Sequence, residues 1–152
     1  MEKVTEIAEK LKPILERHQV VLAYLFGSAA RGEMGPHSDI DLGVVFDHPL
    51  SSEEGFKRRL RLSSDVTGAL GVEDADVIDL QTAKDPLIKH NAVFTGVPIL
   101  VKDVDHRFVI ERQIVREYEN TKPLRRIASL VLREQLRDNT FGRPLMRPKF
   151  GP

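Results

Sequence analysis

Two acidic residues separated by one position, Asp39 and Asp41, are the residues of this sequence best suited to do chemistry. Side chains alternate between the two faces of a β-strand, so both carboxylates point to one side if this segment is extended. Two carboxylates on one face repel each other, and a cation between them relieves that repulsion. Oxygen ligands at this separation suit Mg²⁺, which also binds phosphate oxygens. The pair therefore predicts one half of a metal and phosphate site.

The other half of the site is predicted ten residues earlier, at Gly27 and Ser28. These two residues follow the apolar run VVLAYLF, residues 20–26, which is typical of a buried strand. A glycine at a strand end lets a ligand approach the backbone, and residues 29–31 can begin a helical turn. Backbone N–H groups of such a turn, together with the Ser28 hydroxyl, form an anion site. A surface loop with solvated acids is the alternative interpretation.

The remaining pattern predicts a small mixed β-sheet with helices packed on it, an α/β (α+β) fold in the order αββαβαβαα. Strands are expected at residues 20–26, 39–46, 76–80 and 97–101. Helices are expected at the N-terminus and at about residues 51–71, 85–96, 105–120 and 124–137. Ser51 and Glu54 have capping-box spacing at the start of the second helix, and Asp85 before Pro86 has the pattern of an N-cap at the start of the third. Its expected core contacts are Phe56, Leu60, Val66 and Leu70.

Overall composition excludes several classes of protein. The 23 basic residues balance the 23 acidic ones, so no general nucleic-acid or membrane binder is indicated. The absence of cysteine excludes disulfides and zinc thiolate sites. No apolar run approaches the roughly 20 residues of a membrane span, and the charged N-terminus is unlike a signal peptide. We therefore expect a cytoplasmic protein.

Charge is distributed unevenly along the chain. Residues 121–152 contain eight Lys or Arg against two acids. We therefore predict a domain at residues 1–120, followed at 121–152 by a C-terminal helix and a basic tail that contains proline and glycine. The tail has two interpretations, a solvated extension and a segment that binds an acidic partner.

The segment LFGSAARGEMGPHSDIDL, residues 25–42, resembles the signature of the nucleotidyltransferase superfamily typified by DNA polymerase β. A strand, Gly-Ser, a spacer, an acid pair and a second strand follow in the order seen in that family. The sequence motifs GSAARG and SDIDL are similar to those of the minimal nucleotidyltransferase (MNT) branch of this superfamily. The resemblance covers roughly residues 5–118.

The resemblance implies a third carboxylate on a later strand, and we assign it to Asp76 within EDADVIDL, residues 73–80. Asp74 shares the face of Asp76, whereas Asp79 lies on the opposite face and is expected to be an ordinary polar residue near the strand end.

The resemblance also implies how the site residues act. Asp39 and Asp41 are expected to hold Mg²⁺ and ATP, with Gly27, Ser28 and Arg31 on the outer phosphates. Asp76 is expected to help bind a second Mg²⁺ and to activate the acceptor hydroxyl. Ser38 fits either a phosphate contact or a turn cap.

Minimal members of the family act as antitoxins beside HEPN-domain proteins, and some transfer AMP from ATP to a tyrosine of a HEPN ribonuclease. The resemblance therefore implies a HEPN-domain toxin as partner. Two alternatives stay open, a nucleotidyltransferase for small molecules such as aminoglycosides and an antitoxin that acts by steric binding alone. Neither nucleic acid nor membrane is an expected partner, and the oligomeric state is open.

Overall fold

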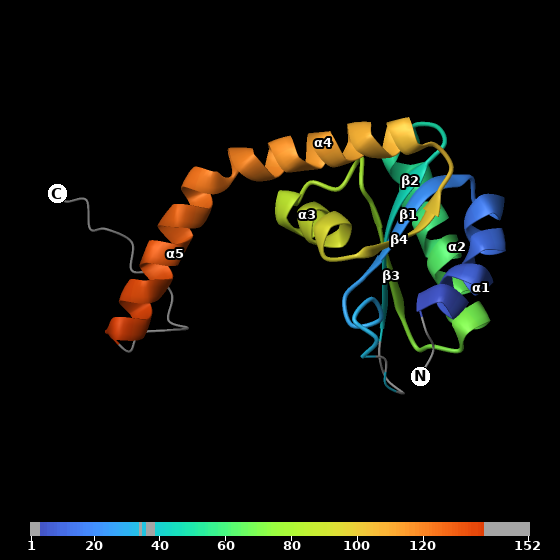
Figure 1. The fold of residues 1–152 in the computed structure, drawn as a ribbon, viewed down its shortest axis with the longest axis horizontal. Helices are drawn as coiled ribbons and strands as arrows, with labels where there is room; N and C mark the ends of the chain where they lie inside the picture. The colour runs from blue at the N-terminus through green and yellow to red at the C-terminus, as the bar shows by residue number, and fades with distance from the viewer. Residues whose placement is uncertain (1–3, 34, 36–38, 139–152) are drawn as a thin grey trace. The chain divides into compact units, whose positions relative to one another are not determined.

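The computed structural model describes residues 4–33, 35 and 39–138. The elements are α1 (Val4–Arg17), β1 (Val20–Phe26), β2 (Ile40–Phe46), α2 (Ser52–Leu70), β3 (Ala75–Asp79), α3 (Pro86–Phe94), β4 (Val97–Val101), α4 (Val104–Asn120) and α5 (Lys122–Arg137) (Figure 1). This order and the mixed sheet confirm the predicted fold class. The chain divides into two compact units, Met1–Tyr118 and Glu119–Pro152. Within the described residues no helix is both long and apolar enough to cross a membrane.

The four strands form one sheet in the order β3-β2-β1-β4. β1 is antiparallel to both of its neighbours, whereas β2 and β3 are parallel. β1 and β2 lie in the centre of the sheet, which explains their nearly continuous apolar sequences. β4 is an edge strand, where a proline such as Pro98 is tolerated because one side of the strand has no neighbour to bond. Because β2 and β3 are parallel, both strands begin at the same end of the sheet.

Helices cover both faces of this sheet (Figure 1). α1 and α2 pack on one face, where Ile40, Leu42 and Val44 of β2 belong to the hydrophobic core. α3 and α4 pack on the other face against alternate residues of β1, including Leu22 and Tyr24. The alternation of side chains along β1 and β2 thus divides the interior into two cores and fixes which face each polar residue of these strands must use.

Both helix starts that the sequence predicted from capping residues are confirmed. Ser51 accepts a hydrogen bond from the backbone N–H of Glu54 at 3.2 Å and caps α2. Asp85 accepts one from the N–H of Leu87 at 2.9 Å and caps α3. Each cap satisfies a backbone donor that the helix itself leaves unpaired, so these boundaries follow from local chemistry.

The predicted core face of α2 is partly wrong. Phe56 and Leu60 are each 56% exposed, whereas Leu62 and Val66 are fully buried and Leu70 packs at the edge of the core. Side chains two positions apart on a helix point about 200° away from each other, so Leu60 and Leu62 cannot face the same core. Phe56 lies one turn before Leu60 and shares its exposed side. The apolar face of α2 therefore follows the register of Leu62 and Val66.

This register predicts opposite results for two leucines two positions apart. Leu62→Ala should lower the free energy of unfolding by about 2–5 kcal/mol, because it leaves a cavity among buried side chains. Leu60→Ala should change it by less than about 0.5 kcal/mol, because that side chain is mostly in solvent. Urea unfolding of both variants measures the difference. Equal losses would show that both leucines lie in the core.

Candidate active site

Asp41 occupies the second position of β2, between two neighbouring strands. Its Cα pairs with that of Phe26 in antiparallel β1 and with that of Asp76 in parallel β3. Ile40 and Leu42 point into the core under α1 and α2, so the Asp41 carboxylate projects from the opposite face. Aligned residues of paired strands point to the same face, and Asp76 therefore projects beside Asp41. The structure brings together these two acids, which the sequence predicted from segments more than thirty residues apart.

Gly27 directly follows β1 and touches the Asp41 side chain. Its φ of +73° is in the left-handed region that side chains disfavour. A Cβ added at Gly27 would overlap Oδ2 of Asp41 and approach its carboxyl carbon to 3.3 Å. The position therefore requires glycine for two reasons, its backbone conformation and the carboxylate that fills the place of a side chain. Through this contact the end of β1 helps to position Asp41.

Residues Gly27 to Gly32 form a compact turn, as predicted. The carbonyl of Ser28 accepts hydrogen bonds from the N–H of Arg31 at 3.2 Å and of Glu33 at 2.9 Å. The N–H of Gly32 donates to the carbonyl of Ala29 at 3.2 Å. Ala29 is buried and belongs to the core under α1 and α2. The turn is thus closed by its own backbone and anchored to the sheet, next to the acids.

Arg31 lies at the surface of this turn. Its Nε donates to Oε2 of Glu33 at 3.0 Å, and the two side chains are 60% and 61% exposed. An exposed pair of this kind is worth less than about 1 kcal/mol, so the guanidinium can exchange Glu33 for phosphate oxygens. Burial and the neighbouring acids raise the pKa of Asp41, and the positive charge of Arg31 partly offsets this rise. Ser38, the remaining predicted phosphate residue, lies outside the described residues.

Like charges surround Asp41. Burial raises the pKa of its carboxyl above the ordinary value of 3.8, and the negative charges of Asp76 and Asp39 raise it further. Asp39 is exposed and immediately precedes β2. Asp74 adds a smaller contribution of the same sign, and its Oδ1 also accepts a hydrogen bond from the N–H of Ala75 at 2.9 Å. The sequence placed Asp74 on the face of Asp76 but gave it no role in the site.

The donor set fits a divalent cation that prefers oxygen. Across the described part of the chain, no three His, Asp or Glu side chains already converge on one metal position. Mg²⁺ commonly uses one or two carboxylates together with substrate phosphates and water, instead of a cage made only of protein. The raised pKa of Asp41 reflects negative charge that such a cation would neutralise. Asp39, Asp41 and Asp76 are therefore suitable ligands.

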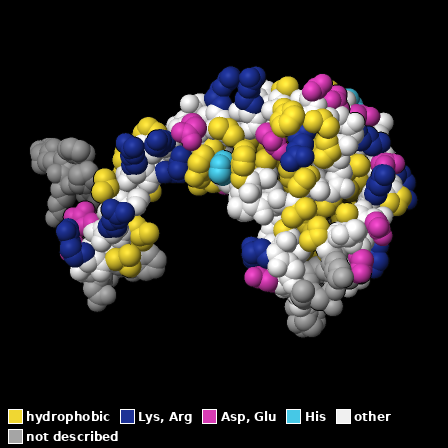
Figure 2. Space-filling view, viewed as in Figure 1, with side chains coloured by type: hydrophobic (Ala, Val, Ile, Leu, Met, Phe, Trp, Pro, Cys, Tyr) yellow, Lys and Arg dark blue, Asp and Glu magenta, His cyan; other side chains and the backbone are white. Residues whose placement is uncertain are grey.

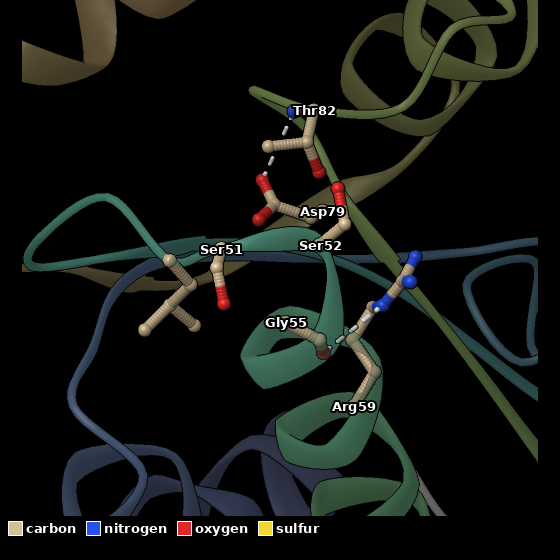
Figure 3. Close-up of a pocket in the computed structure, with 7 residues that line it drawn as sticks. Ser51, Ser52, Gly55, Arg59, Asp79 and Thr82 are labelled. Carbon is tan, nitrogen blue, oxygen red and sulfur yellow. Dashed lines mark hydrogen bonds between the residues drawn. The ribbon is translucent and has the colours of Figure 1, made fainter.

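Asp79 has a structural place at the other end of β3. Its side chain is 5% exposed, and its Oδ1 accepts hydrogen bonds from the N–H groups of Gln81 at 2.8 Å and Thr82 at 3.3 Å. Figure 3 shows it beside a small cavity at the start of α2. The residues around this cavity are Leu50, Ser51, Ser52, Gly55, Arg59, Asp79 and Thr82. Asp79 closes the turn after the strand, away from the three acids.

Comparison with known families settles the class of protein. Residues 9–105 match the family model described as polymerase beta, nucleotidyltransferase. The chain belongs to this family. The match runs from α1 to the start of α4 and contains the turn after β1 and all the predicted acids. α5 lies beyond it.

Two relatives of this nucleotidyltransferase come from the archaeon Methanocaldococcus jannaschii, and both are provisionally named protein adenylyltransferases. One is 34% identical over 90 residues, which is 59% of this chain and 87% of the relative. The other is 35% identical over 97 residues, which is 64% of this chain and 98% of the relative. The nucleotidyltransferase thus aligns with almost the whole of one of these relatives.

Similar solved structures come from toxin and antitoxin complexes. A chain in a toxin–antitoxin crystal structure with AMP-PNP has a TM-score of 0.68 at 23% identity and covers 82% of this chain and 97% of its own. A chain in the complex of a tri-AMPylated HEPN toxin from Shewanella oneidensis with an MNT antitoxin has a TM-score of 0.63 at 21% identity, with coverage of 82% and 95%. At these identities the likeness shows that the nucleotidyltransferase shares their fold.

The burial and negative surroundings of the Asp41 carboxylate predict that this site lowers the stability of the folded nucleotidyltransferase at neutral pH. A carboxyl whose folded-state pKa lies above 3.8 contributes most to stability below pH 3.8, and that contribution is lost as pH rises through the folded-state pKa. Asp41→Asn removes a charge that burial and the neighbouring acids disfavour, and it should therefore raise the melting temperature at pH 7.5 in EDTA by about 1–3 °C. The difference should shrink near pH 4. A lower melting temperature for the variant at pH 7.5 would contradict this prediction.

Proposed function

We propose that this chain is a Mg²⁺-dependent protein adenylyltransferase antitoxin, which transfers AMP from ATP to a tyrosine hydroxyl of a HEPN ribonuclease toxin and so neutralises it. The alignment of Asp41 with Asp76, next to Gly27, is the observation that carries the catalytic part of this proposal. The family match supports nucleotidyl transfer. The names of the archaeal relatives and the HEPN complexes of the similar structures support a protein acceptor. The expected location is the cytoplasm, where ATP is available.

The proposed roles follow the positions of the residues. Asp39 and Asp41 would hold Mg²⁺ with the nucleotide, and the metal would supply positive charge that stabilises the triphosphate during transfer. The turn at Gly27 and Ser28 offers N–H and hydroxyl groups to the outer phosphates, and Arg31 reaches them from the surface. Ser38 fits the same phosphates or the turn before β2.

Asp76 is the carboxylate that acts on the hydroxyl group of the acceptor. It lies beside Asp41 but on a different strand, so it can approach a hydroxyl on the other side of the α-phosphorus. The acceptor oxygen attacks the α-phosphorus while its proton passes to the Asp76 carboxylate. The bond from the α-phosphorus to the bridging oxygen then breaks, and pyrophosphate leaves with that electron pair. The products are an AMP ester of the tyrosine and pyrophosphate.

The domain boundaries are proposed in the same terms. Residues 1–120 form the nucleotidyltransferase domain, and residues 121–152 form a C-terminal helix and basic tail for partner binding. The family match ends before the second segment begins. Catalysis and partner binding are therefore assigned to different parts of the chain.

Transfer of label from ATP tests the proposal. The chain is incubated with Mg²⁺ and a HEPN-type protein as the acceptor, using ATP labelled either at the α-phosphate or at the γ-phosphate. We expect label on the protein acceptor only from α-labelled ATP, with release of pyrophosphate, and mass spectrometry should locate AMP on tyrosine. Label from the γ-position would indicate a kinase and would refute nucleotidyl transfer.

Two other outcomes separate the alternatives. Label that appears on an added aminoglycoside, and on no protein, would indicate a nucleotidyltransferase for small molecules. A stable complex with the HEPN-type protein and no transfer at any Mg²⁺ concentration would indicate an antitoxin that acts by steric binding.

A further inference from the structure

α5 is an amphipathic helix whose apolar side chains face solvent. None of its residues is buried. Leu124 is 69% exposed, Leu130 63%, and Ile127 and Leu136 59% each. Single exposed leucines are ordinary on protein surfaces, but several on one helix of four turns mark a surface that binds another molecule.

The apolar and basic residues of α5 lie on different sides of the helix. Leu124, Ile127 and Val131 follow the spacing i, i+3, i+7 and form one stripe. Arg126 and Arg133 recur every two turns, about 200° away from Leu124 and Val131. Figure 2 shows hydrophobic and basic side chains adjoining on the surface of this helix. Such a helix typically lays its apolar stripe into a groove of a partner.

The charge of α5 defines the chemistry of that partner. The helix contains five basic residues and one acid, Glu134. Five basic residues minus one acid give each α5 a net charge of +4, so two copies repel each other and a second α5 is a poor occupant. An apolar groove with Asp and Glu at its rim complements both the stripe and Arg125, which lies about 100° from Leu124 on the flank of the stripe.

The rest of the chain has the opposite charge. Of the 23 basic and 23 acidic residues, eight basic and three acidic ones lie in residues 119–152. Residues 1–118 therefore contain 15 basic and 20 acidic residues and repel an acidic partner at long range. Attraction for a partner with an acidic groove must come from the C-terminal segment, where α5 lies.

We propose that α5 is the docking helix for the protein acceptor, and that its stripe of Leu124, Ile127 and Val131 fits an apolar groove with an acidic rim on that protein. This inference rests on the proposed function, because it takes the acceptor to be a protein. The family match ends at residue 105, so α5 can hold the acceptor without belonging to the nucleotide site. Affinity for the acceptor and chemical transfer are then separable properties of the chain.

Binding measurements with the full chain test this inference. Calorimetry uses the HEPN-type protein and an Asp41→Asn background, so that no transfer occurs during titration. Leu124→Asn with Ile127→Asn should weaken binding at least tenfold, because both anchors become polar. Ser129→Asn is the matched control, since it introduces the same residue on the other side of α5, and it should change the Kd by less than about threefold. The melting temperature of each α5 variant should stay within about 1 °C of the Asp41→Asn background, because none of the replaced α5 side chains is buried.

Charge is tested separately with Arg125→Glu, at the basic residue on the flank of the stripe. This variant should bind about tenfold more weakly at 50 mM salt, and most of the difference should disappear at 500 mM salt. Equal salt dependence in wild type and variant would contradict the acidic rim.

The outcomes distinguish this inference from the proposed function. If the Leu124 and Ile127 variant binds like wild type while AMP transfer proceeds, the docking helix is refuted and the function stands. If binding depends on α5 but wild type transfers no AMP, the function fails and the docking helix stands. If wild type alone dimerises and these substitutions make it monomeric, the occupant is a second copy and the proposed acidic partner is wrong. If wild type does not bind the HEPN-type protein, the inference is refuted.

Discussion

Asp41→Asn should reduce the rate of AMP transfer about a thousandfold. The substitution preserves the shape of the side chain but removes the negative charge that attracts the metal and the triphosphate. Asp41 lies between β1 and β3, with Gly27 against its carboxylate, so no neighbouring acid can take its position. Initial rates of incorporation of α-label across a Mg²⁺ titration measure the loss, and higher Mg²⁺ should not restore the rate.

Two further substitutions, at Asp76 and at nearby Asp74, test which residue supplies the third carboxylate. Asp76→Asn should also lower the transfer rate by at least a hundredfold, because Asp76 is the residue aligned with Asp41. Asp74→Asn removes the same charge two residues earlier, outside β3, and should lower the rate less than tenfold. A larger loss from Asp74→Asn than from Asp76→Asn would show that the third carboxylate was assigned to the wrong residue.

Gly27→Ala should be nearly as damaging, although it adds only a methyl group. The new Cβ would occupy the place of the Asp41 carboxylate, so either that side chain or the turn must move. The left-handed φ of Gly27 adds strain for any other residue. We expect a loss of transfer rate of at least a hundredfold, since small displacements of a catalytic group are costly, together with about 1–3 kcal/mol of stability.

Gly68→Ala is the control for this substitution. Gly68 lies within α2 and a Cβ there meets no atom within 4 Å. Alanine is the better helix former, so this variant should gain up to about 1 kcal/mol of stability and keep the wild-type transfer rate. Transfer at the wild-type rate by Gly27→Ala would show that the contact with Asp41 does not position the catalytic carboxylate.

Local features of the sequence were sufficient to predict the elements of the fold. β1 and β4 have the predicted bounds, because an apolar run ended by glycine and a strand with proline at an edge are decided by nearby residues. The starts of α2 and α3 were predicted for the same reason, since Ser51 and Asp85 each bond to a backbone N–H two or three residues away.

Features that depend on distant residues were not predictable in the same way. The predicted buried face of α2 was wrong at Phe56 and Leu60. The sequence of α2 contains two apolar stripes, and only contact with the sheet and α1 decides that the stripe at Leu62 is buried. The pairing of Asp41 with Asp76 depends on the register of two strands separated by a helix. The contact of Gly27 with Asp41 is equally invisible in a linear pattern, where that glycine shows only that a turn begins.

The most direct test of the central claim, that this chain neutralises its partner by catalysis, is rescue of growth in cells that express the HEPN-type toxin. The account predicts that wild type restores growth, and that Asp41→Asn, produced at the same level and bound to the toxin with wild-type affinity, does not. Full rescue by Asp41→Asn would contradict the account, because binding alone would then be sufficient for neutralisation.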